Sequence, residues 1–192
     1  FSRLLVQQPN DARLYFGRGM DFMLVQDYEN ALKDINRAIE LQPDFLQPYF
    51  VRAVIMTKQL EIDPLLPPET VAQEAPVGVN PIDRLKELPQ IARPKVPEVS
   101  TKSFRYDAIL KDYETILRLD PNFIFAYYNM AEIYSLEKDY RAAIDSYTQA
   151  IKIEPQFAEA YFNRGLSRLS IGETAVGLDD LRKAGELGVV ES

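Results

Sequence analysis

Few residues of this chain combine the types and the spacing that enzyme chemistry requires. The sequence contains no histidine and no cysteine, so it offers neither an imidazole base nor a thiol nucleophile, and zinc has no Cys or His ligand. The adjacent carboxylates Asp179 and Asp180 are a candidate pair for acid–base work. Adjacent residues of a helix do not share a face, however, so a structural role is favoured for both. We predict that the chain is not an enzyme and that it binds no metal and no cofactor.

A second pattern of charged residues indicates a structural role. Three arginines are each matched by an aspartate further along the chain: Arg18 with Asp34, Arg52 with Asp112, and Arg164 with Asp180. At the corresponding places of another segment, Met130 and Ser146 replace both members together. We infer ion pairs between two helices that fix the helix register, with chance co-occurrence as the alternative. Asp180 is then assigned to Arg164 rather than to catalysis.

The elements that position these pairs repeat along the chain. Tyrosines mark the start of four apolar helical patterns: Tyr15, Tyr49, Tyr127 and Tyr161. The interval between the first two equals the interval between the last two, whereas the middle two are more than twice as far apart. Pro43, Pro121 and Pro155 keep the same register. The shorter interval, about 34 residues, is the length of a helix-turn-helix repeat.

Residue types within the repeat carry a family resemblance. The first helix places an aromatic, a large, a small and another aromatic residue on one face, as in Tyr127, Met130, Ala131 and Tyr134, and in Tyr15, Arg18, Gly19 and Phe22. The second helix has Ala143, Tyr147 and Ala150, followed by Pro155. The chain resembles the tetratricopeptide repeat family, which implies an all-α fold, a right-handed α-α superhelix. Departures from the family pattern occur at Arg168, Gly177 and Val189.

The resemblance implies a division into repeats. We expect residues 1–11 to end a preceding repeat, and further repeats to span 12–45, 46–61 with 104–123, 124–157 and 158–192. A proline-rich insertion at 62–103 interrupts the second of these repeats. Residues 61–103 hold eight of the 13 prolines, which excludes a long helix there. We expect a short helical turn at 82–88, extended chain elsewhere, and partial packing of the segment against the repeats; two PxxP spacings are weak signals for a proline-binding domain.

The resemblance also implies a binding surface on the first helices of the repeats. The concave face of the family, carried over by position, contains these residues: Phe16, Met20, Phe50, Val54, Phe125, Tyr128, Asn129, Glu132, Phe162, Asn163 and Leu166. The positions that clamp a terminal carboxylate in some relatives hold Phe16, Met20, Val51, Phe125 and Asn129, which argues against that ligand. Asn129 and Asn163 would bind a peptide backbone through their amides. The alternative is that many of these residues pack between neighbouring repeats.

Charge and hydropathy limit the partners. The net charge of −7 and the absence of a basic run argue against nucleic acid, because phosphate binding needs a concentrated positive surface. No apolar run approaches the roughly 20 residues that span a bilayer, so we predict no membrane insertion. We expect a soluble protein, with the cytoplasm and the periplasm both open as its compartment.

The function predicted from the sequence is protein binding. We expect a non-catalytic scaffold that holds a protein or peptide segment on the concave face. One alternative is a self-assembly module that forms a homo-oligomer through uncapped ends, where the candidate residues are Leu4, Leu5, Leu181 and Leu187. Another is a regulatory segment of a larger multidomain protein.

Overall fold

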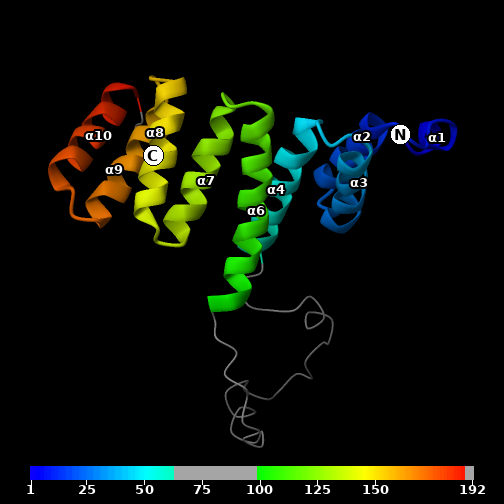
Figure 1. Ribbon diagram of the computed structural model, residues 1–192, viewed down its shortest axis with the longest axis horizontal. Coiled ribbons are helices and arrows are strands. Elements are labelled where there is room, and N and C mark those ends of the chain that lie inside the picture. Colours follow the sequence, from blue (N-terminus) through cyan, green and yellow to red (C-terminus); the bar gives the residue numbers. More distant parts are fainter. Residues whose placement is uncertain (63–98, 189–192) are drawn as a thin grey trace, which may run out of the picture.

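Paired helices follow one another in chain order (Figure 1). The computed structural model describes residues 1–62 and 99–188, and no strand occurs among them. The helices of this part are α1 (Ser2–Gln7), α2 (Ala12–Leu24), α3 (Tyr28–Leu41), α4 (Leu46–Ile62), α6 (Val99–Leu119), α7 (Ile124–Leu136), α8 (Tyr140–Ile153), α9 (Ala158–Ser170) and α10 (Thr174–Glu186). None of the helices in these ranges is long and apolar enough to cross a membrane.

Each helix packs mainly against its neighbours in the sequence. The pairs are α2 with α3, α4 with α6, α7 with α8, and α9 with α10, and contacts of α3 with α4, α6 with α7 and α8 with α9 join one pair to the next. The predicted all-α fold of stacked helix pairs is confirmed. Such a chain buries its core continuously along the stack rather than in one centre.

The turns that join the two helices of a pair have similar backbone conformations, and two of them share an aspartate cap. Asp27 and Asp139 cap the second helix of their pairs, because each side chain accepts a hydrogen bond from a backbone N–H of the first turn. The residue before each cap, Gln26 or Lys138, has a positive φ of 61° or 63°. Gly172 occupies the corresponding place between α9 and α10 with a φ of 83°. Left-handed residues reverse the chain here, and glycine adopts this conformation without strain.

Small residues let the paired helices approach each other. Ala131 on α7 and Ala143 and Ala150 on α8 have no exposed surface, and Tyr147 of α8 is 1% exposed among them. These four residues belong to the helix motifs that the sequence presents. Their burial explains the motif, since a larger side chain at an alanine would separate the helices.

Helices α9 and α10 approach each other closely at two facing glycines. A Cβ atom added to Gly165 would lie 2.9 Å from the carbonyl oxygen of Gly177, and one added to Gly177 would lie 3.0 Å from that of Gly165. The first distance is shorter than real Cβ contacts, and the second is so tight that the neighbouring backbone would have to shift. The glycine at 177, a departure from the family pattern, is therefore matched by a second glycine on the facing helix.

Helices α4 and α6 form a pair although a long segment of sequence separates them. Helix α6 begins at Val99, so residues 99–103, which we predicted to belong to the insertion, are helical instead. No proline lies between Pro97 and Pro121, so the sequence allows this longer helix. Most of the predicted insertion, its helical turn at 82–88, its PxxP spacings and its packing lie outside the described residues, as does Val189.

Candidate functional site

The three arginine–aspartate pairs form in the structure. Asp34 binds both Nε and Nη2 of Arg18, at 2.6 and 2.7 Å. Arg52 makes the same two contacts with Asp112, at 2.8 and 2.6 Å, across 60 residues of sequence. Bidentate geometry fixes the angle between two helices as well as their distance. The pairs join α2 to α3 and α4 to α6, so their role is to align the helices of a pair.

The third pair is extended by a further arginine. Arg164 binds Asp180 through Nε and Nη2 at 2.8 and 2.7 Å, and Arg168 donates to the same carboxylate at 2.8 Å. Arg168 stands where the family pattern has an aromatic residue, and this contact explains the departure. Asp180 is thereby engaged by two arginines, whereas Asp179 is exposed and bonds Arg182. The adjacent carboxylates do not act together.

Tyrosines of the repeat support the arginines. The guanidinium carbons of Arg18, Arg52 and Arg164 lie 5.7, 5.6 and 5.3 Å from the ring centroids of the tyrosines three residues earlier, which are Tyr15, Tyr49 and Tyr161. Cations at this distance are attracted by the ring face. The tyrosines at the start of these repeats thus stabilise the arginines that align the two helices of each pair.

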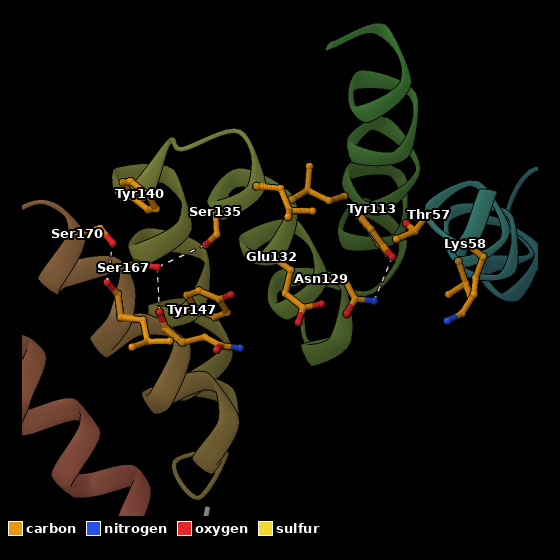
Figure 2. A pocket seen from close by; sticks show the side chains of 15 residues that line it. Thr57, Lys58, Tyr113, Asn129, Glu132, Ser135, Tyr140, Tyr147, Ser167 and Ser170 are labelled. Atoms are coloured by element: carbon orange, nitrogen blue, oxygen red, sulfur yellow. Dashed lines mark hydrogen bonds between the residues drawn. The ribbon is translucent and has the colours of Figure 1, made fainter. Parts of the chain in front are cut away.

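A cavity of about 510 Å³ opens between the later helix pairs (Figure 2). We call it the central cavity. It is lined from α4 by Val54, Thr57 and Lys58, from α6 by Tyr113, from α7 by Asn129, Glu132, Ile133, Ser135 and Leu136, from α8 by Tyr140 and Tyr147, and from α9 by Asn163, Leu166, Ser167 and Ser170. Its size is within the range of cavities that hold small ligands or parts of a peptide.

Amide–tyrosine hydrogen bonds build the wall of the central cavity. Asn129 donates from Nδ2 to the Tyr113 hydroxyl at 3.0 Å, and Asn163 donates from Nδ2 to the Tyr128 hydroxyl at 2.9 Å. Tyr147 and Asn163 both line the central cavity. Each asparagine thereby bonds a tyrosine of the preceding helix pair. These contacts join adjacent pairs and orient the amide groups.

The tyrosines of this network stay neutral to high pH. Burial raises the pKa of Tyr113 and of Tyr147 to about 12. The pKa of Tyr128 is also raised, first by burial and then by the nearby charge of Glu132. Neutral hydroxyls both donate and accept hydrogen bonds, so the network is intact in the physiological range.

Five of the predicted face residues line the central cavity. They are Val54, Asn129, Glu132, Asn163 and Leu166. Leu166 is 43% exposed, so its apolar side chain is available for contact. The cavity brings together predicted residues from α4, α7 and α9, which are the first helices of three pairs.

Other predicted residues are occupied by packing. Phe16 meets Phe45 edge-on at 5.1 Å and, with Met20, packs against the buried cluster that includes Ile35 and Val51. Phe50 packs edge-on against Tyr113 and Phe123, with ring centroids 6.3 and 5.4 Å apart. These side chains join neighbouring pairs, as the alternative interpretation of the face expects.

The remaining predicted residues lie outside the central cavity's lining. Phe125 is 53% exposed and has Phe123 and Phe157 at centroid distances of 6.2 and 6.4 Å. Tyr128 lies between Tyr147 and Phe157, at 5.7 and 4.9 Å. Phe162 is half-buried on α9. Phe125 is therefore an exposed member of a row of aromatic contacts that continues through Phe157 to Tyr128.

Sequence reasoning did not select Tyr113 and Tyr147 as site residues, although a signal for them exists. They are one repeat length apart, and each is followed at the same interval by an asparagine, Asn129 or Asn163. At the corresponding positions of the first two pairs, Ile35 and Val51 share one buried apolar cluster. In these three cases, the residue on the second helix of one pair and the residue on the first helix of the next pair are either both polar or both apolar. That correlation predicts a contact between successive repeats.

Comparisons with known proteins agree on the fold. The family model of the tetratricopeptide repeat matches residues 12–45 and 124–157. A crystal structure of the protein MamA superposes with a TM-score of 0.67 and 17% identity, covering 97% of this chain and 78% of that one. A MamA structure running from residue 41 to the end, from Desulfovibrio magneticus RS-1, has a TM-score of 0.66 and 13% identity, covering 95% and 78%. No curated protein sequence matches the chain.

At these identities the solved structures show a common architecture, and the family model adds the repeat motif itself. The two matched segments coincide with the pairs α2–α3 and α7–α8. The chain therefore contains tetratricopeptide repeats in these two segments, and arrays of such repeats are protein-interaction scaffolds in general and typically non-catalytic.

Proposed function

We propose that the central cavity holds an extended segment of a partner protein. The observation that carries the proposal is the pairing of oriented amides with an exposed apolar side chain. Asn129 has one N–H bonded to Tyr113, and an asparagine amide has a second N–H and a carbonyl oxygen to offer. These groups match the alternating acceptors and donors of a peptide backbone.

Apolar contact supplies the second part of the binding surface. Leu166 and Leu136 line the central cavity and are 43% and 65% exposed. A side chain of the partner that covers them removes apolar surface from water at both sides of the contact. Amides that orient a segment and leucines that bury its side chains together suit a protein ligand.

A selected peptide with a matched pair of variants tests this function. Peptides are first selected on the intact chain from a random displayed library, and their affinities are then measured by isothermal titration calorimetry. Leu166→Ser should weaken binding about tenfold, the loss of roughly one buried aliphatic contact. Leu178→Ser is the control, because Leu178 is 55% exposed on α10 and does not line the cavity. Equal affinities of the two variants would contradict the proposal.

Self-assembly is a second candidate function. Leu4 and Val6 on α1 are 48% and 84% exposed, and Val176 and Leu178 on α10 are 44% and 55% exposed. Of the other leucines predicted for assembly, Leu5 is buried, which removes it from such a surface. Sedimentation equilibrium of the intact chain distinguishes the candidates. A mass that stays at one chain across a hundredfold range of concentration would exclude assembly through these surfaces.

A further inference from the structure

One part of the central cavity combines exposed leucines with serine hydroxyls. We call it the leucine end, and it consists of six lining residues from α7 and α9: Ile133, Ser135, Leu136, Leu166, Ser167 and Ser170. Leu136 and Leu166 are exposed, whereas Ile133 and Ser167 are buried. The leucines therefore belong to the rim of the cavity, and the two buried residues belong to its inner surface.

The serine hydroxyls of the leucine end donate their protons within the chain (Figure 2). Ser167 donates to the backbone carbonyl oxygen of Asn163 at 2.9 Å, and Ser170 donates to that of Leu166 at 3.0 Å. The hydroxyl oxygen of Ser135 lies 3.4 Å from that of Ser167. Because a hydroxyl has one proton and Ser167 has already donated its own, Ser135 is the donor in that contact. The three serines thus present acceptor lone pairs and carbon surface to a ligand.

The leucine end is also uncharged, because none of its six residues ionises as a side chain. The charged residues that line the rest of the central cavity are Lys58 and Glu132. Each of them takes part in interactions within the chain. Figure 2 shows Glu132 beside Asn129, and Lys58 on α4 beyond Thr57. A side chain that enters the leucine end therefore meets neither a charge nor a hydroxyl proton from its six residues.

We propose that the leucine end takes an aliphatic side chain, such as leucine, isoleucine or methionine, from the partner segment. The inference rests on the proposed function and specifies the chemistry of the partner. An aliphatic side chain removes the two leucines from water and needs no hydrogen bond, so the serine hydrogen bonds stay as they are. A side chain that must accept hydrogen bonds would lose water there without replacement, which is unfavourable.

The helix register joins this subsite to the amides that orient the segment. Asn163, Leu166 and Ser170 are three and four residues apart along α9, so they share one face of that helix. Asn129 and Leu136 are seven residues apart along α7 and likewise share a face. A segment whose backbone contacts the asparagines can therefore place one side chain between Leu136 and Leu166.

Three peptide sublibraries test the inference on the intact chain. They share randomised flanking positions and differ at one central residue, which is leucine, alanine or asparagine. Binding is measured by fluorescence polarisation. The leucine sublibrary should bind about tenfold more tightly than the alanine sublibrary, and asparagine, which is close to leucine in shape, should bind no better than alanine. Equal binding of leucine and alanine, or binding of asparagine as tight as that of leucine, would overturn the inference.

Matched variants assign the preference to the leucine end. Leu136→Ser should reduce the preference for leucine, because it removes one of the two apolar contacts. Leu24→Ser is the control, since Leu24 is also the exposed last residue of the first helix of a pair, and it does not line the cavity. A preference that survives unchanged in Leu136→Ser, with circular dichroism showing a folded variant, would also overturn the inference.

Ser170→Ala tests the role given to the hydroxyls. Because Ser170 donates to the Leu166 carbonyl oxygen rather than to a ligand, the variant should bind the three sublibraries with the same order of affinities as the original chain. A loss of asparagine binding relative to alanine binding in this variant would show that the hydroxyl serves polar side chains, which contradicts the inference.

Leu166→Ser separates this inference from the proposed function. If the original chain binds the three sublibraries equally and the variant weakens them all, the cavity binds a segment and the inference about the leucine end is wrong. If the variant changes no affinity, or no sublibrary binds the original chain, the proposed function and the inference are both wrong. Weaker binding by the variant, together with a leucine preference that depends on Leu136, supports both.

Discussion

At the scale of residues, the chain uses charged and polar side chains mainly to join helices. Asp112 is 3% exposed and accepts two hydrogen bonds from Arg52, whose third nitrogen donates to Asn36 of α3 at 2.7 Å. The guanidinium thus links α4, which carries it, to two other helices, α3 and α6. Asp112 also raises the pKa of Arg52, since its carboxylate stabilises the cation. A buried pair of this kind contributes specificity of geometry more than net stability.

Removing one member of the pair should be costly. Arg52→Ala leaves the Asp112 carboxylate buried without its cation, so the free energy of unfolding should fall by about 3 kcal/mol in urea titration. Arg37→Ala is the control, because Arg37 forms an exposed pair with Glu40 and its loss should leave the urea midpoint almost unchanged. Similar losses in the two variants would mean that the Arg52 pair does not align α4 with α6.

Buried tyrosines make the stability depend on pH at the alkaline end. The pKa of Tyr147 rises from 10.0 to about 12 on folding, so the folded state holds its proton more tightly than the unfolded state. Stability is therefore complete below about pH 10 and falls as the pH rises toward 12, by on the order of 2 kcal/mol for this tyrosine. Urea titrations at pH 9 and 11.5 should show a smaller decline for Tyr147→Phe than for the original chain. An equal decline would contradict the assignment.

At the scale of elements, residue spacing predicted the helix pairs well. The repeat period placed α2–α3 and α7–α8 because small residues and prolines recur at fixed places in it. The ion pairs followed from the same register, even across the segment that separates α4 from α6. The same spacing did not predict which residues of the concave face are already packed against a neighbouring helix pair. Whether Phe50 is free depends on Phe123 of the next pair, and a pattern within one repeat does not contain that information.

The contact between α9 and α10 offers a test of packing. Gly177→Ala adds a Cβ that would lie 3.0 Å from the Gly165 carbonyl oxygen and 3.1 Å from Leu169, so the variant should lose about 1–3 kcal/mol of unfolding free energy. Gly185→Ala in the same helix has nothing within 4 Å of the added carbon. It should gain up to about 1 kcal/mol from helix propensity. Stabilisation by both substitutions in urea titration would show that α9 and α10 are further apart.

At the scale of the whole molecule, the stack divides its joining surfaces into two kinds. Between the first two pairs, Ile35 and Val51 share an apolar cluster. Between the later pairs, Asn129 with Tyr113 and Asn163 with Tyr128 make polar contacts. The central cavity lies along this polar part.

Side-chain amide signals test the central claim, that the cavity holds a peptide segment, most directly. In nitrogen-15 NMR spectra of the intact chain, a saturating selected peptide should shift the Nδ2 signals of Asn129 and Asn163. The signal of Asn30, which bonds the Asp27 cap of α3, should stay in place. Shifts at Asn129 and Asn163 alone would place the peptide against the polar wall. An unchanged pair of cavity signals at saturation would show that the segment binds elsewhere on the molecule.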